Sequence, residues 1–245
     1  MNIRNMSYII FYDNNEVYML DYGEDARYRY GLPGGKIDEG ETSFEALNRE
    51  LGEEMNYSVN ERGLIRLDNI NIKYKYFDKE CKSNINLYIK EHSQGFRDLN
   101  EGLEIVKLDV SKALKLSMTE PIKESLEMYI TYKIQKEIEK IFLKNSFMVE
   151  RENEEYTLLK YMEEKEYGAV SVYVYKNRKE ILLNYGEITH EHLDEYDFES
   201  GRYLEEIENY LEKLLNDEIY FSSNKIRDKY PDFPRDYYVF SGKLR

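Results

Sequence analysis

The stretch from Gly35 to Tyr57 constrains this chain most, because a glycine turn leads there into a short helix with one acidic face. Residues 42–45 read Thr-Ser-Phe-Glu, a capping box that predicts the start of a helix at about Ser43. Asn56 predicts the helix end, since Asn tolerates the left-handed backbone conformation that closes many helices. We therefore expect a helix of about three turns between these residues.

The predicted helix has two distinct faces. Glu50, Glu53 and Glu54 are three or four residues apart, which places their carboxylates on one face. The apolar residues on a neighbouring face that can be buried are Phe44, Leu47, Leu51 and Met55. Carboxylates this close repel one another, and a hard divalent cation such as Mg²⁺ relieves the repulsion. The pattern predicts a metal site for a phosphorylated substrate.

This stretch resembles the Nudix box, Gly-x5-Glu-x7-Arg-Glu-U-x-Glu-Glu-x-Gly-U, in which U is a bulky apolar residue. The matching polar positions are Gly35, Glu41, Arg49, Glu50, Glu53 and Glu54. Leu51 and Tyr57 occupy the apolar positions, and Asn56 stands where the family has Gly. The preceding residues 30–34 also resemble the family's approach to the box.

The resemblance implies an Mg²⁺-dependent hydrolase, with Mn²⁺ as an alternative metal, that cleaves the diphosphate bond of a nucleoside diphosphate linked to another moiety. Glu50, Glu53 and Glu54 would be the metal ligands, together with the backbone carbonyl of Gly35. Arg49 would hold Glu50 or a neighbouring acid by a charge-assisted hydrogen bond. The partner would be a small nucleotide whose identity the sequence leaves open.

The remaining site residues are less closely defined. Glu41 would face the site from its loop, Gly34 would contact the substrate, and Tyr74 lies where some dinucleoside-polyphosphate hydrolases carry a tyrosine. The general base is either a glutamate of the box or an acid from a distant loop. Glu101 and Glu104 are the candidates for such a loop acid.

Two other functions are compatible with the same motif. One is a Nudix-fold sensor that binds a nucleotide metabolite and signals through a second domain. The other is the removal of caps or triphosphates from RNA 5′ ends, which would require a basic RNA path. Two features favour the enzyme over the sensor. The box is intact, and residues 146–245 carry 14 basic against 23 acidic side chains, the wrong balance for a reader of duplex DNA.

Composition limits the protein class. The 245-residue chain has a net charge of −14, which disfavours broad binding to nucleic-acid backbones or anionic membranes. Its single cysteine, Cys81, excludes an internal disulfide and fits a reducing compartment. We find no signal peptide and no apolar run of membrane-spanning length, so we expect a cytoplasmic protein. The sequence makes no prediction about oligomeric state.

The elements expected before residue 146 fit an α/β fold, a Nudix α/β/α sandwich with a mixed sheet. Besides the box helix, we expect strands at 7–12, 16–22, 64–68, 70–77, 84–90 and 104–108 and helices at 110–116 and 121–144. A polar loop is expected at 92–103. The expected domain boundaries are 1–146 for the Nudix domain and 147–245 for an accessory domain.

The C-terminal hundred residues match no family pattern, and we expect a smaller α+β domain. Strands are expected at 156–162, 168–175, 179–185, 218–222 and 236–240, and a helix at 202–215. The polar segment 150–155 is expected to be a linker. Because all the metal-binding residues precede it, residues 1–146 alone are expected to fold and to retain hydrolysis.

Overall fold

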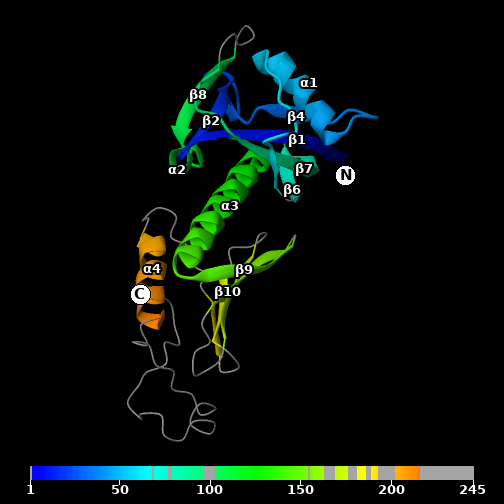
Figure 1. Cartoon of the computed structure of the whole chain (residues 1–245). Helices are drawn as coiled ribbons and strands as arrows, with labels where there is room; N and C mark the ends of the chain where they lie inside the picture. The colour runs from blue at the N-terminus through cyan, green and yellow to red at the C-terminus, as the bar shows by residue number, and fades with distance from the viewer. Residues whose placement is uncertain are drawn as a thin grey trace, which may run out of the picture. The chain divides into compact units, whose positions relative to one another are not determined.

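The chain divides into two compact units, Met1–Ile130 and Thr131–Arg245, in the computed structural model (Figure 1). The structure describes residues 2–67, 69–76, 79–96, 103–153, 155–162, 169–175, 181–185, 189–192 and 202–215. In this part of the chain no helix has the length and apolar character needed to cross a membrane.

The first unit is built on a mixed sheet around strand β1 (Asn2–Asp13). This strand pairs in parallel with β7 (Lys79–Glu91) and in antiparallel fashion with β2 (Glu16–Asp21) and β4 (Gly34–Lys36). The other strands are β3 (Tyr30–Gly31), β5 (Ile65–Arg66), β6 (Ile70–Tyr76) and β8 (Glu104–Asp109). Because β1 is long, its middle residues pair with β4 and its end pairs with β2, and this brings the start of the loop before the box helix beside the middle of β1.

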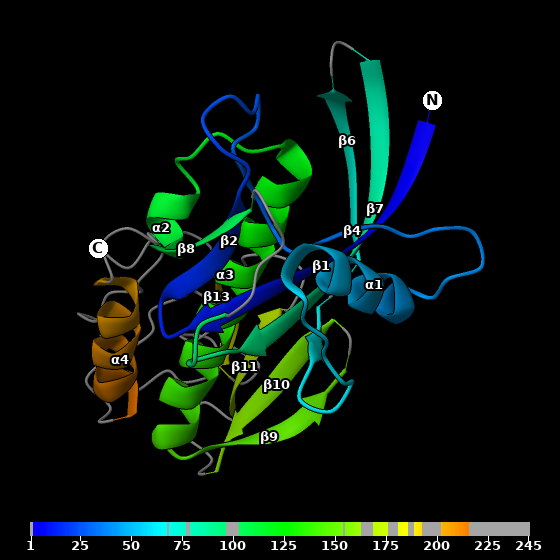
Figure 2. The ribbon, with the colours of Figure 1, turned by 90° about the horizontal axis from the view of Figure 1, so that it is seen from above.

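The expected N-terminal hairpin is confirmed. Tyr12 pairs with Val17 and Asp13 with Glu16, and the turn between the strands uses Asn14 with a φ of 56°. Strand β7 is longer than expected, because it continues the hairpin with β6 outward beside the first residues of β1 (Figure 2).

Helices cover both faces of this sheet, as expected for an α/β/α sandwich. The box helix, α1 (Ser43–Met55), buries its apolar side against one face of β1 and β2. On the opposite face of β1 the ring of Tyr12 lies 5.5 Å from that of Tyr129 in α3 (Glu120–Lys144). The short helix α2 (Val110–Ala113) is shorter than expected. In Figure 1, α1 lies on one side of β1 and the start of α3 on the other.

In its described residues the second unit contains an antiparallel sheet, the second half of α3 and a further helix, as expected for an α+β domain. Its strands follow one another in the order of the chain. They are β9 (Phe147–Glu152), β10 (Tyr156–Tyr161), β11 (Val170–Tyr175), β12 (Ile181–Tyr185) and β13 (Thr189–His192). Helix α4 (Arg202–Leu215) buries Ile207 and Leu211.

The linker predicted at 150–155 is wrong in its first half. Residues up to Glu152 belong to β9, which pairs with β10 through Leu158–Arg151 and Thr157–Glu152. β9 is an edge strand in which only Phe147 is buried, so it lacks the alternation of apolar and polar residues that marks a strand. The strands expected at 218–222 and 236–240 lie outside the described residues.

The boundary between the compact units falls inside α3, after Ile130. Tyr129 packs within the first unit, whereas Phe142, near the other end of the helix, contacts Phe147 of β9 with 4.9 Å between the ring centroids. Lys144 Nζ also binds the carboxylate of Glu208 in α4 at 2.5 Å. The proposed domain boundary at residue 146 therefore lies just after a helix that belongs partly to each unit.

Candidate active site

Helix α1 is fixed at both ends by its own caps. The Thr42 hydroxyl accepts a hydrogen bond from the Glu45 amide, and the Glu45 carboxylate accepts one from the Thr42 amide, which confirms the capping box. Asn56 ends the helix in the left-handed conformation, with φ 47° and ψ 41°, as predicted. Since Leu47 and Leu51 are fully buried, the rotation of the helix about its axis is set, and the glutamate face lies beside β4.

Two glycines bring the backbone of β4 against this helix. Gly34 has a φ of 118°, and a Cβ atom there would lie 2.2 Å from the carbonyl oxygen of Ser7. At Gly35 a Cβ atom would lie 2.4 Å from the carboxyl carbon of Glu50. Only glycine therefore allows β4 to pair with β1 while the Glu50 carboxylate lies directly against the turn.

Arg49 organises the carboxylates on one side of the site. Its Nε and Nη2 atoms donate to the two oxygens of Glu41 at 2.9 and 3.1 Å, and Nη1 donates to Glu50 at 3.0 Å. Nη1 also reaches Glu53 at 3.5 Å, and Nη2 donates to the carbonyl of Lys36 at 2.9 Å. The hydrogen bonds from Arg49 hold the pKa of the Glu41 carboxyl below its usual range. Arg49 thus contacts Glu50, as expected, and Glu41 and Glu53 as well.

Glu54 lies in a different environment, on the other side of the acidic face. Its carboxylate accepts a hydrogen bond from the Gly34 amide at 3.0 Å, and the Tyr22 hydroxyl lies near it. Burial, with the nearby charges of Glu50 and Glu53, raises the pKa of Glu54 to about 7, and the Gly34 amide and the Tyr22 hydroxyl oppose this rise. Glu54 is therefore held beside the carboxylates of Glu50 and Glu53, and a bound cation would relieve the repulsion among the three.

The chemistry of these donors fits a hard divalent cation. Glu50, Glu53 and Glu54 offer only oxygen atoms, and the absence of a Cβ at Gly35 leaves its backbone open toward Glu50. In the described part of the chain, however, no three acidic, histidine or cysteine side chains are already gathered tightly enough to hold a metal. The ion pairs of Arg49 with Glu50 and Glu53 explain this arrangement, because they turn both carboxylates toward the guanidinium.

The other predicted site residues are placed as follows. Tyr74, on β6, accepts a hydrogen bond from the Ser83 hydroxyl at 3.2 Å. Glu104 begins β8, is exposed, and pairs through its backbone with Asp21. Glu101 lies outside the described residues. Among the described residues no hydrogen bond or ion pair joins Glu104 to the box, and the role of Glu101 stays a prediction.

Two tyrosines at the site escaped the sequence analysis. The Tyr22 hydroxyl lies near Glu54, and the Tyr22 ring lies against the backbone of Gly31, where an added Cβ would be 2.8 Å from Cε2. Tyr8 is buried, and its environment includes Tyr22, Tyr74 and the carboxylates of Glu54 and Glu50. The chain has 25 tyrosines, so no tyrosine stands out by composition or spacing. The pairing of Tyr8 with Gly34 across β1 and β4 is the feature that brings it to the site.

Comparisons with known proteins place this unit in a family. The family model for the NUDIX domain matches residues 1–113. Among solved structures, the chain is similar to the E. coli dihydroneopterin triphosphate pyrophosphohydrolase, with 20% identity and a TM-score of 0.41, over 51% of this chain and 92% of that one. It is also similar to a C. elegans Ap4A hydrolase binary complex, with 17% identity and a TM-score of 0.40, over 52% of this chain and 93% of that one.

A third similar structure is the NUDIX domain of Shewanella oneidensis NrtR complexed with ADP ribose, with 14% identity and a TM-score of 0.40, over 52% of this chain and 84% of that one. A comparison with curated proteins gave no match. The family model covers the residues that form the motif, the helix caps and the glycine turn. The chain therefore carries, in residues 1–113, a domain of the Nudix family.

Proposed function

We propose that the first unit hydrolyses the diphosphate bond of a nucleoside diphosphate linked to another moiety. One observation carries the proposal: each of the four matching acids of the box accepts a hydrogen bond from Arg49 or from the Gly34 amide just before the box. Arg49 binds Glu41, Glu50 and Glu53, and the Gly34 amide binds Glu54. Phosphoryl-transfer chemistry depends mainly on such positioning and on neutralising charge.

Glu50, Glu53 and Glu54 would hold Mg²⁺, with the carbonyl of Gly35 as a further ligand. A bound Mg²⁺ supplies neutralisation of the phosphate charge and activation of a water molecule. The chain's own residues then do the remaining work. Arg49 keeps Glu50 and Glu53 from separating, and the Gly34 amide holds Glu54 beside β4, near the Tyr22 hydroxyl. Glu53 is the most exposed of the three, with 61% of its side chain accessible, and it faces the solvent from which the attacking water comes.

The experiment is a substrate screen with the full chain. Nucleoside diphosphates linked to sugars, to other nucleosides and to longer phosphate chains are incubated with protein and Mg²⁺. For substrates without a terminal phosphate, alkaline phosphatase then releases phosphate only from the products, so cleavage of linked diphosphates can be scored. Substrates that end in a terminal phosphate are scored by separating the products chromatographically. Release from at least one class supports the proposal, and tight binding without release would favour a nucleotide sensor instead.

A further inference from the structure

The face of β1 that carries Tyr8 is opposite to the face that packs on α1, and it continues from the Glu54 carboxylate beside β4 toward the start of the strand. Tyr8 pairs with Gly34, whose amide binds Glu54. Arg4 is four residues away along β1, so the period of two in a strand places it on the same face, about 13 Å from Tyr8. A substrate chain that extends along this face from Glu54 would therefore reach Arg4.

Arg4 is part of a stack of two arginines and two tyrosines, named here the arginine–tyrosine column. The Arg4 guanidinium lies 5.0 Å from the ring centre of Tyr76, and Tyr76 stacks on Tyr28 with 5.9 Å between centroids and 22° between planes. Arg27 completes the column at 5.7 Å from the ring centre of Tyr28. The four residues come from β1, β6 and the loop between β2 and β3, so the tertiary fold builds the column.

The loop that carries Tyr28 is held firmly at its base. The carboxylate of Asp21, only 5% exposed, accepts two hydrogen bonds from Arg29 Nε and one from Nη2, at 2.8 to 3.0 Å, and a fourth from the Gly23 amide at 2.9 Å. The Tyr22 amide also donates to the carbonyl of Arg29 at 2.8 Å. These bonds fix the path of the loop on both sides of Tyr28.

Tyr8 and Tyr74 lie on the same face of the sheet as the column. Tyr74 is two residues before Tyr76 on β6 and therefore shares its face. Burial raises the pKa of the Tyr8 hydroxyl, and the nearby Tyr22, Tyr74 and Glu54 add to this rise. Aromatic rings with hydroxyl groups offer both stacking surface and hydrogen bonds to a nucleotide.

The chemistry of Arg4 matches a phosphate. The Arg4 guanidinium lies over the Tyr76 ring, and a guanidinium in this position can still donate its N–H groups to an anion. Among the described residues no carboxylate lies within ion-pair distance of Arg4. Lys79 pairs with Tyr76 across the hairpin and adds a second cation to the same face, in a chain with a net charge of −14.

We propose that Arg4, seated on Tyr76, binds a phosphate group of the substrate that lies beyond the bond to be cleaved. This inference rests on the proposed function for the identity of the substrate. It narrows the substrate class to nucleotides whose phosphate chain continues past the scissile bond, in preference to nucleoside diphosphates linked to an uncharged sugar.

The test compares Arg4→Gln and Tyr76→Leu with a matched control, Arg66→Gln, in the full chain. Arg66 is an exposed arginine of β5 whose guanidinium binds Asn69 and Asn86 at 3.2 and 2.6 Å. Calorimetry measures the binding of tripolyphosphate without divalent cations, so that this readout does not depend on hydrolysis. Steady-state kinetics then compares a dinucleoside tetraphosphate with ADP-ribose, and melting temperatures check that each variant is folded.

We expect Arg4→Gln to weaken tripolyphosphate binding and to raise the KM for the tetraphosphate about tenfold, with kcat unchanged, because the lost contact acts equally on ground and transition states. Tyr76→Leu should act in the same direction, and Arg66→Gln should change neither value. Unaltered binding and KM in both column variants would overturn the inference. A wild-type protein that binds tripolyphosphate through Arg4 but cleaves no nucleotide would retain the anion site and refute the proposed function instead.

Discussion

At the residue scale, the most demanding position of the site is Gly35. Gly35→Ala would place a Cβ atom 2.4 Å from the carboxyl carbon of Glu50, so either Glu50 or β4 must move. A displacement of about 1 Å in a catalytic array costs about a hundredfold in rate, and we expect a loss of that order. Turnover of the substrate found in the screen is the measurement.

The matched control is Gly52→Ala in α1, where an added Cβ meets no atom within 4 Å. Ala in an exposed helix interior is more stable than Gly by about 0.5 to 1 kcal/mol. Gly52→Ala should therefore raise the free energy of unfolding by this amount and keep full turnover. If both variants lost turnover equally, the loss in Gly35→Ala would not be caused by the contact between residue 35 and Glu50.

Asp21 provides a pH-dependent prediction. The hydrogen bonds from Arg29 lower the pKa of Asp21 below its value in the unfolded chain, about 3.9. A lowered pKa in the folded state stabilises the protein above the unfolded pKa, and this contribution is lost as the pH falls through the folded pKa. Asp21→Asn should thus lower the melting temperature at pH 7, and its difference from wild type should shrink below about pH 4.

The control for this prediction is Asp25→Asn, an exposed acid in the same loop. Thermal unfolding followed by circular dichroism from pH 3 to pH 7 compares the three proteins. A difference between Asp21→Asn and wild type that does not change with pH would mean that the ion pair with Arg29 does not contribute to stability.

At the scale of elements, the end of α1 depends on the left-handed conformation of Asn56. Asn56→Gly should be neutral or stabilise the protein by a few tenths to about 1 kcal/mol, since Gly adopts this conformation without strain. Asn56→Val should destabilise it by about 1 to 2 kcal/mol, because a β-branched side chain clashes there. Urea unfolding measures both, and a Val variant as stable as wild type would contradict the observed cap.

The sequence predicts α1 well because its signals are local. The cap at Thr42, the glutamate spacing and Asn56 each act within one or two helical turns. The role of Tyr22 was not predictable, because its contact with Glu54 depends on how β2, β3 and β4 assemble in space. Strand β9 was missed for a different reason, since an exposed edge strand needs few apolar residues.

At the scale of the whole molecule, we predict that residues 1–146 alone fold and retain hydrolysis. This fragment keeps all of α3 and every box residue. It also removes the partner of Phe142 in β9 and the ion pair of Lys144 with Glu208, so its melting temperature should be below that of the full chain. Circular dichroism and the same substrate panel test both parts, and loss of soluble folding would show that the two units depend on each other.

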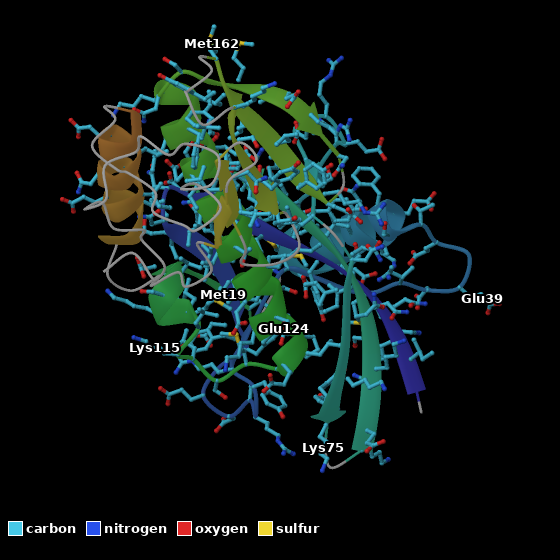
Figure 3. The ribbon with its side chains drawn as sticks, turned by 90° about the horizontal axis from the view of Figure 1, so that it is seen from below. Met19, Glu39, Lys75, Lys115, Glu124 and Met162 are labelled. Carbon is cyan, nitrogen blue, oxygen red and sulfur yellow. The ribbon has the colours of Figure 1, made fainter. Side chains whose placement is uncertain are left out.

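Glu39, on the surface near the box, provides the control for a Mg²⁺ titration of turnover. Figure 3 shows Glu39 at the outer end of the loop between β4 and α1, and the side chain is exposed. Glu39→Gln removes one negative charge from this loop without touching the acidic face of the helix. It therefore matches Glu53→Gln in chemistry and differs from it in position.

The most direct test of the account is a Mg²⁺ titration of turnover for wild type, Glu53→Gln and Glu39→Gln. We predict that wild type requires Mg²⁺ and that Glu39→Gln behaves like it. Glu53→Gln should lose turnover by orders of magnitude while remaining folded, because removing a like charge from one helix face does not destabilise the helix. Turnover without Mg²⁺, or near-full activity of Glu53→Gln, would contradict the assignment of the box glutamates as the metal site.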